Sequence, residues 1–200
     1  MTAHTIVLAT RNNGKIAEIE ALLSDFNVVV KGLGDYPEIG EIPETGTTFA
    51  ENARIKACAV AQATGLVALA DDSGLVVDAL DGAPGVYSAR FAGETASDDD
   101  NNTKLLNELK NVPDDQRQAR FVCVLCACRP DGETLFAEGF WEGEILRDLR
   151  GTNGFGYDPL FYDPAAQKAS AEMTRDEKSS RSHRGQALAA LKTQWLTFFV

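Results

Sequence analysis

The 200-residue sequence is poor in basic residues and in histidine, and it has no long apolar run. Its 19 lysines and arginines face 30 acidic residues, and the net charge of −11 argues against a nucleic-acid binder, which needs a basic surface. No apolar stretch is long enough to cross a bilayer, and the N-terminus lacks the basic and apolar regions of a signal peptide. We therefore expect a cytoplasmic protein with no membrane and no nucleic-acid partner.

Histidine and cysteine do not form the pattern of a zinc site. The four cysteines are Cys58, Cys123, Cys126 and Cys128. The last three fall in a predicted strand, where alternation places Cys123 on one face and Cys126 and Cys128 on the other. Only His4 and His183 could add imidazole ligands. We expect Cys123, Cys126 and Cys128 to be small core residues.

The apolar share of 44% is enough for a packed core, and the length suits one domain over residues 1–200, with room for a small second lobe. Alternating and continuous apolar runs predict strands at 5–9, 28–30, 66–70, 119–128 and 133–145. Spacings of three and four predict helices after several of them. The apolar stripe of the first helix is Ile16, Ile19, Leu23 and Phe26, and that of the last is Leu188, Leu191, Trp195 and Phe198.

Two adjacent carboxylates, Asp71 and Asp72, follow the apolar run 66–70, and Ser73 and Gly74 come next. We expect this pair at the end of a buried strand, the place where ligands gather in open α/β sheets. Carboxylates are costly to desolvate, so a pair there commonly faces a cation or a water to be activated. A polar turn with no ligand is the alternative, because Asp-rich turns are common.

The loop Thr10-Arg11-Asn12-Asn13-Gly14-Lys15 joins the first strand to the first helix. This arrangement can aim backbone N–H groups at an anion, although it lacks the first glycine and the hydroxyl residue of a Walker A loop. A cation such as Lys15 at a helix start opposes the helix dipole, so a negative partner is expected.

Thr48 and Glu51 form a capping box that opens a helix running to Gly65. Asn52 and Lys56 lie one turn apart on this helix and could point together into a site. Periodicity alone favours an exposed polar face for them.

The glycine-rich loop 81–93 has a length that is often functional, and residues 151–159 form a second glycine-rich segment with Phe155 between two glycines. An aromatic on so bare a backbone is suited to stacking on a planar ring. A tight turn around a buried phenylalanine is the alternative.

Seven segments in order resemble the inosine/xanthosine triphosphate pyrophosphatases, from residue 5 to about residue 190. They are Thr10–Lys15, Glu44–Gly46, Phe49–Ala57, Ala70–Leu75, Gly82–Arg90, Gly151–Pro159 and Ser182–Gly185. Each motif is moderately specific, and all seven in order are highly specific. The resemblance implies an α/β fold with an elongated mixed sheet flanked by helices, two lobes with the active site in the cleft between them, and a homodimer.

The resemblance also implies Mg²⁺-dependent hydrolysis of ITP, dITP and XTP to the monophosphate and pyrophosphate, which removes deaminated purine nucleotides. Asp72 would be the proton acceptor, and Glu44 and Asp72 would bind the metal. Substrate would contact a larger set: Thr10, Arg11, Asn12, Asn13, Gly14, Lys15, Lys56, Ser73, Phe155, Gly156, Tyr157, Asp158, Lys178, His183 and Arg184. Thr10 to Lys15 would hold the triphosphate, and Phe155 to Asp158 with Lys178, His183 and Arg184 would enclose the base.

In this chemistry Lys15 and Lys56 would absorb charge on the departing pyrophosphate, and Asp72, or its pair with Asp71, would take the proton. Donors from Lys178 and Arg184 to the 6-keto oxygen would select against ATP. Two other functions stay open: a metal-dependent phosphatase that releases orthophosphate, and a nucleotide sensor without activity. A sensor has no need of a water-activating carboxylate.

Overall fold

The computed structural model describes residues 4–23 and 27–199, and the chain divides into two compact units. Unit 1 comprises Met1–Asp72, Cys123–Gly139 and Arg184–Val200, and unit 2 comprises Ser73–Val122 and Phe140–His183.

Within the described residues, seven strands form one mixed sheet in the order β2-β1-β3-β4-β5-β6-β7. The strands are β1 (His4–Leu8), β2 (Val28–Gly32), β3 (Val67–Val77), β4 (Gln118–Cys128), β5 (Thr134–Ile145), β6 (Phe161–Asp163) and β7 (Lys168–Ala169). The helices are α1 (Asn13–Leu22), α2 (Phe49–Thr64), α3 (Asp98–Glu108), α4 (Arg175–Arg181) and α5 (His183–Phe199). Strand β1 pairs parallel with β2 and β3, whereas β6 pairs antiparallel with β5 and β7. The predicted α/β class with a mixed sheet and flanking helices is confirmed.

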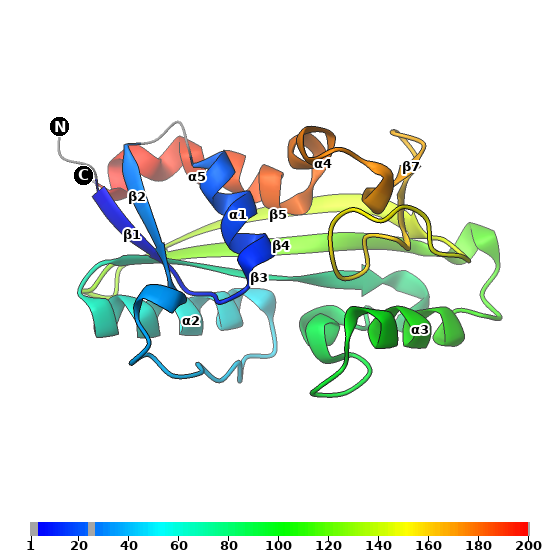
Figure 1. Cartoon of the computed structure of the whole chain (residues 1–200), viewed down its shortest axis with the longest axis horizontal. Helices are drawn as coiled ribbons and strands as arrows, with labels where there is room; N and C mark the ends of the chain where they lie inside the picture. Colours follow the sequence, from blue (N-terminus) through cyan, green and yellow to red (C-terminus); the bar gives the residue numbers. More distant parts are fainter. Residues whose placement is uncertain (1–3, 24–26, 200) are drawn as a thin grey trace. The chain divides into compact units, whose positions relative to one another are not determined.

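Unit 1 has helices on both faces of its strands. Helices α1 and α5 cover one face and α2 covers the other (Figure 1). The first face buries apolar side chains that include Ile6, Leu69 and Leu125 against Ile19 of α1 and Leu188 of α5. The predicted stripes of both helices are therefore core, but Phe26 and the side chain of Trp195 lie outside the described residues.

Unit 2 is built around an aromatic core. The rings of Phe121, Trp141 and Phe161 pack with centroid distances of 4.5 to 6.3 Å. Leu105 and Leu109, from α3 and its C-cap, bury into the same cluster. The loop 81–93 contains a 3₁₀ helix at Gly85–Arg90.

The predicted strand end before Asp71 is wrong, because β3 continues through both aspartates to Val77. Strand β1, however, pairs with β3 only from Val67 to Leu69. Asp71 and Asp72 thus lie just beyond the β1–β3 ladder, where β1 has turned into the loop that leads to α1.

One cysteine prediction is wrong. Cys58 of α2 and Cys128 of β4 form a disulfide, with a Cα–Cα distance of 5.3 Å that suits the bond. Cys123 and Cys126 are buried free thiols, as expected for core residues. Burial raises the pKa of the Cys126 thiol to about 12, which keeps it protonated. Among the described residues no helix is both long and apolar enough to cross a membrane.

Candidate active site

The ammonium group of Lys56 joins two carboxylates in unit 1. Its Nζ lies 2.7 Å from Glu44 Oε1 and 2.7 Å from Asp72 Oδ1. A third hydrogen bond, 2.9 Å long, runs to the backbone oxygen of Asp71. An ammonium has three N–H donors, so each has an acceptor. The structure thus brings together Glu44, Lys56 and Asp72, three residues that the sequence separates by up to 28 positions.

Helix α2 places Lys56 beneath β3. The capping box of Thr48 and Glu51 is present as predicted and fixes the start of the helix. Asn52, one turn before Lys56, is fully buried, and its Oδ1 accepts a 2.8 Å hydrogen bond from the backbone N–H of Gly46. The expected exposed polar face is therefore wrong: Asn52 and Lys56 are both buried, because they hold the loop of Glu44 and the strand of Asp72.

Asp71 is bound by two other cations of unit 1. Its Oδ1 lies 2.6 Å from Lys15 Nζ, and its Oδ2 lies 2.7 Å from Arg184 Nε. The Asp71 side chain is 0% exposed. Lys15 lies in the first turn of α1 and Arg184 in the first turn of α5. The Asp71 carboxylate is therefore the negative partner expected for a cation at a helix start.

Local hydrogen bonds shape the loop before α1. Asn12 caps the helix, because its Oδ1 accepts from the backbone N–H of Lys15 at 3.1 Å, and the Asn12 N–H donates to Thr10 Oγ1 at 3.1 Å. Arg11 donates to the backbone oxygens of Leu33 and Ile39. Gly14 lies in the first turn of α1, and the Asn13 side chain lies outside the described residues.

A hollow of about 330 Å³ lies against this loop. Its lining includes Thr10, Arg11, Glu41 and Lys56. Arg11 and Lys56 are cationic and Thr10 carries a hydroxyl, groups that can bind phosphate oxygens, whereas Glu41 is acidic. The rest of the lining is Ala9, Leu33, Gly40 and Ile42.

The two adjacent aspartates differ in their acid–base properties. Burial acts to raise the pKa of Asp71, but Arg184 and Lys15 outweigh it and hold this pKa well below its ordinary value of 3.8. Burial raises the pKa of Asp72, and Lys56 opposes the effect without cancelling it. Burial acts to lower the pKa of Lys56, but Asp72 and Glu44 outweigh it and raise that pKa. Of the two carboxylates, Asp72 is the more basic.

The donor set fits a hard divalent cation. Carboxylate oxygens of Glu44 and Asp72 lie within reach of one ammonium, and the buried Oδ2 of Asp72 has no hydrogen-bond partner in the described part of the chain. Residues 4–23 and 27–199 contain no cluster of three or more metal-binding side chains. Two carboxylates are nevertheless enough for Mg²⁺, which keeps several waters and takes further ligands from substrate phosphates.

In unit 2, the second glycine-rich segment is held by α3. The backbone N–H of Gly156 donates to Asp98 Oδ2 at 2.6 Å, and its backbone oxygen accepts from Asn102 Nδ2 at 2.9 Å. Both polar backbone groups of Gly156 thus have partners on one helix. Asp98 and Asn102 were not among the residues predicted for the site, so their part in holding this loop was missed.

Asp158 organises the rest of the loop. Its Oδ2 accepts from Lys178 Nζ at 2.6 Å and from the backbone N–H of Phe155 at 2.9 Å, and its Oδ1 accepts from Ser170 Oγ at 2.8 Å. The Lys178 ammonium also lies 5.2 Å from the centre of the Phe155 ring. The structure therefore groups Phe155, Asp158 and Lys178, which the sequence assigned to base binding.

Other predicted residues have their own contacts. Tyr157 is buried in the core of unit 2, and its hydroxyl donates to the backbone oxygen of Ser88 at 2.8 Å. The His183 ring stacks on Phe121 with centroids 4.8 Å apart. Ser73 is half-buried and follows Asp72 on β3.

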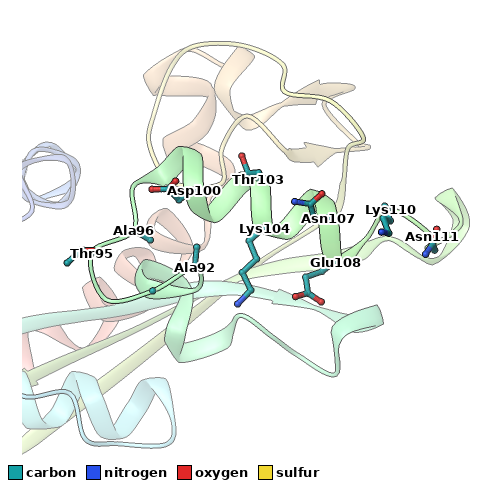
Figure 2. A pocket seen from close by; sticks show the side chains of 11 residues that line it. Ala92, Thr95, Ala96, Asp100, Thr103, Lys104, Asn107, Glu108, Lys110 and Asn111 are labelled. Atoms are coloured by element: carbon teal, nitrogen blue, oxygen red, sulfur yellow. The ribbon is translucent and has the colours of Figure 1, made fainter.

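A larger hollow of about 680 Å³ lies on unit 2 beside α3 (Figure 2). Its lining comes from residues 92–111 and includes Asp100, Lys104 and Glu108. None of the predicted site residues with a described side chain belongs to this lining. Lys104 is already bonded to the backbone oxygen of Phe91 at 2.7 Å.

Comparison with known proteins identifies relatives of this chain. The sequence profile of the Ham1 family matches residues 6–194. The chain belongs to the Ham1 family. A relative from Nitratidesulfovibrio vulgaris, named dITP/XTP pyrophosphatase, is 57% identical over 100% of this chain and 99% of its own length. A protein of the same name from Shigella flexneri is 55% identical over 93% of this chain and 95% of its own length.

Solved structures of the family have the same fold. The HAM1 protein from Coxiella burnetii superposes with a TM-score of 0.89 at 46% identity, over 97% of this chain and 99% of that one. A dITP/XTP pyrophosphatase from Mycobacterium abscessus superposes with a TM-score of 0.77 at 46% identity, over 94% of this chain and 98% of that one. The resemblance seen in the sequence is thereby confirmed.

Proposed function

We propose that this Ham1 protein hydrolyses ITP, dITP and XTP to the nucleoside monophosphate and pyrophosphate. The observation that carries the proposal is the group formed by Glu44, Lys56 and Asp72, in which one lysine contacts two buried or half-buried carboxylates. The relatives named dITP/XTP pyrophosphatase support the choice of substrate.

Asp72 is the proton acceptor in this proposal. Its Oδ2 is a buried oxygen without a hydrogen-bond partner among the described residues, so it is placed to accept a proton. Lys56 holds the other oxygen and fixes the orientation of the carboxylate. The water that attacks the α-phosphorus would give its proton to Oδ2 of Asp72.

Lys15 and Lys56 stabilise the leaving pyrophosphate, because fixed cations in a buried site act more strongly than they would in water. Thr10 and Asn12, with the backbone N–H groups at the start of α1, would hold the phosphate chain. Glu44 and Asp72 would hold Mg²⁺, which supplies charge neutralisation on the phosphate oxygens.

Base recognition belongs to unit 2 in this proposal. Phe155 would stack on the purine, and Lys178 would donate to its 6-keto oxygen. Adenine carries an amine at that position, so a buried donor would face another donor when ATP binds. A mismatch of this kind can discriminate by roughly 10⁴-fold.

We further propose that the protein works in the cytoplasm as a homodimer and acts on free nucleotides. The net charge of −11 supports a nucleotide substrate rather than a polynucleotide. Light scattering on a size-exclusion column tests the dimer, and a monomer mass would contradict it.

Product analysis tests the activity. The protein receives ITP, dITP, XTP, ATP or GTP, with Mg²⁺ or with EDTA, and pyrophosphate and orthophosphate are assayed separately. We expect Mg²⁺-dependent pyrophosphate from the first three and little from ATP or GTP. Orthophosphate would indicate a phosphatase, and binding without product would indicate a sensor; either result would overturn the proposal.

A further inference from the structure

Asp71 and Asp72 are neighbours in the sequence but belong to different faces of β3. Successive side chains of a strand point to opposite faces. Asp71 bonds to Lys15 of α1 and Arg184 of α5, which cover one face, whereas Asp72 bonds to Lys56 of α2, which covers the other (Figure 1). The side chains of Asp71 and Asp72 therefore have different binding partners, although the two residues are adjacent in the sequence.

Asp71 is the only link that the described contacts show between the side chains of Lys15 and Arg184. The two cations are 169 positions apart in the sequence, and each binds a different oxygen of one carboxylate at 2.6 and 2.7 Å. Arg184 is 3% exposed and the Asp71 side chain is fully buried, so solvent does not compete for the bond between them, whereas the Lys15 side chain is 19% exposed. Both rotamers are fixed by a carboxylate that the rigid strand holds in place.

We propose that Asp71 is a positioning residue that sets Lys15 and Arg184 in their working places. The inference rests on the proposed function, in which Lys15 stabilises the leaving pyrophosphate and unit 1, which contains Arg184, acts on the phosphates. Asp71 has a cation on each oxygen, and Cys123 Sγ also contacts its Oδ2, so both oxygens are held by side chains. Asp72 has one oxygen on Lys56 and one without a partner in the described chain.

A purely structural ion pair is the competing explanation. It predicts that a variant of Asp71 loses stability but that its folded fraction keeps the wild-type KM and kcat. Positioning predicts a change in the kinetic constants of the folded protein, because a displacement of about 1 Å costs about 10²-fold in rate.

The test compares Asp71→Asn and Asp71→Glu with wild type at a temperature where each variant is folded by circular dichroism. For Asp71→Asn we expect kcat/KM for ITP to fall by about 10²-fold, with KM raised. Asp71→Glu keeps both ion pairs on a longer side chain and should restore part of the loss. Wild-type KM and kcat in folded Asp71→Asn would overturn the proposal.

A matched control lies in the same pocket. Cys123 Sγ contacts Asp71 Oδ2 at 3.4 Å, and Cys123→Ala removes this weak contact while leaving both ion pairs. We expect Cys123→Ala to cost stability and to keep kcat/KM. A loss as large as that of Asp71→Asn would show that any change in this pocket disturbs the site, and it too would overturn the proposal.

If Asp71→Asn does not fold, the double variant Lys15→Met/Asp71→Asn keeps the net charge of the site and is compared with Lys15→Met. The proposal predicts a higher KM for ITP in the double variant, because Arg184 has lost its anchor. Equal KM values would contradict it. If Asp71→Asn folds, the losses in kcat/KM caused by Lys15→Met and by Asp71→Asn should not add in the double variant, since residues that act through one another are coupled.

Binding of inorganic pyrophosphate, measured by calorimetry, separates this inference from the proposed function. Removal of a negative charge alone would tighten pyrophosphate binding, whereas loss of position should weaken it. If wild-type protein binds pyrophosphate but releases none from ITP, the proposed function is contradicted. The inference is then decided by pyrophosphate binding alone, compared between wild type and Asp71→Asn. Tighter binding by Asp71→Asn, or no binding by wild type, would overturn the inference.

Discussion

The predicted site residues of unit 1 are held mainly by ion pairs between side chains, whereas those of unit 2 are held mainly by hydrogen bonds to backbone atoms. The unit 1 group contains three cations and three carboxylates: Lys15, Lys56, Arg184, Glu44, Asp71 and Asp72. In unit 2 the main contacts are hydrogen bonds to backbone atoms. Asp98 accepts from the N–H of Gly156, Asn102 donates to the backbone oxygen of Gly156, and Asp158 accepts from the N–H of Phe155.

This difference suits two different tasks. A balanced set of charges can bind a triphosphate and a cation, which all nucleoside triphosphates share. A loop whose backbone is fixed can present an aromatic ring and a lysine at set places, which is what selection of a base requires. Changes in unit 1 should therefore affect all nucleotides alike, and changes in unit 2 should affect the choice among them.

The largest expected effect comes from Asp72→Asn. We expect kcat for ITP to fall by about 10²- to 10⁴-fold, because the proton acceptor is lost while the side-chain volume is kept. Circular dichroism checks the fold, and steady-state kinetics give kcat. Asp78→Asn is the control, because Asp78 is exposed and pairs only weakly, at 3.3 Å, with Arg120. A variant at Asp72 with wild-type turnover would eliminate it as the base.

Reduction of the Cys58–Cys128 disulfide should destabilise unit 1, which contains all four cysteines of the chain. The bond closes a loop of 70 positions, for which chain entropy alone gives about 4 kcal/mol as an upper figure. Hydrogen exchange with and without dithiothreitol should show the loss first in α2. Thiol titration in denaturant provides the check: two reactive thiols are expected, and four without reductant would contradict the disulfide.

Gly154→Ala should disturb unit 2. Gly154 has φ +81°, and a Cβ there would clash with the carboxylate of Asp158. We expect a loss of about 3 kcal/mol in the free energy of unfolding, from strain and overpacking together. Gly132→Ala is the control, because Gly132 also has positive φ but has open space around it. Equal losses in urea melts of the two variants would show that the Asp158 contact does not matter.

The smallest effect is expected for Asn102→Ala, which removes one of the two bonds to Gly156. A single hydrogen bond contributes about 1 kcal/mol, so the melting temperature should fall by only a few degrees. KM for ITP should nevertheless rise, because Gly156 lies next to Phe155. Asn107→Ala on the exposed side of α3 is the control. If the two variants have the same KM, the α3 anchor has no part in binding.

The sequence predicted most elements because their apolar periodicity is local. The stripes of α1 and α5 and the capping box of α2 need only the residues of each helix. It could not predict that β3 runs through Asp71 and Asp72, because polar residues of low strand propensity continue there only when neighbouring strands pair with them.

The burial of certain polar residues also could not be predicted from the sequence. Asn52 and Lys56 have the spacing of an exposed face, and their partners Gly46 and Asp72 come from other elements. The same holds for Cys58 and Cys128, which the fold brings together across 70 positions. Candidate site residues were therefore found by motif, whereas their partners came from the structure.

The central claim is that unit 1 acts on phosphate and unit 2 chooses the base, and the ratio of kcat/KM for ITP to kcat/KM for ATP tests it most directly. Lys178→Ala should lower this ratio by about tenfold or more, whereas Lys15→Ala should reduce both constants and leave the ratio nearly unchanged. Lys168→Ala, which removes only an exposed ion pair with Glu177, is the control. An unchanged ratio in Lys178→Ala, or a collapsed ratio in Lys15→Ala, would contradict the division of labour.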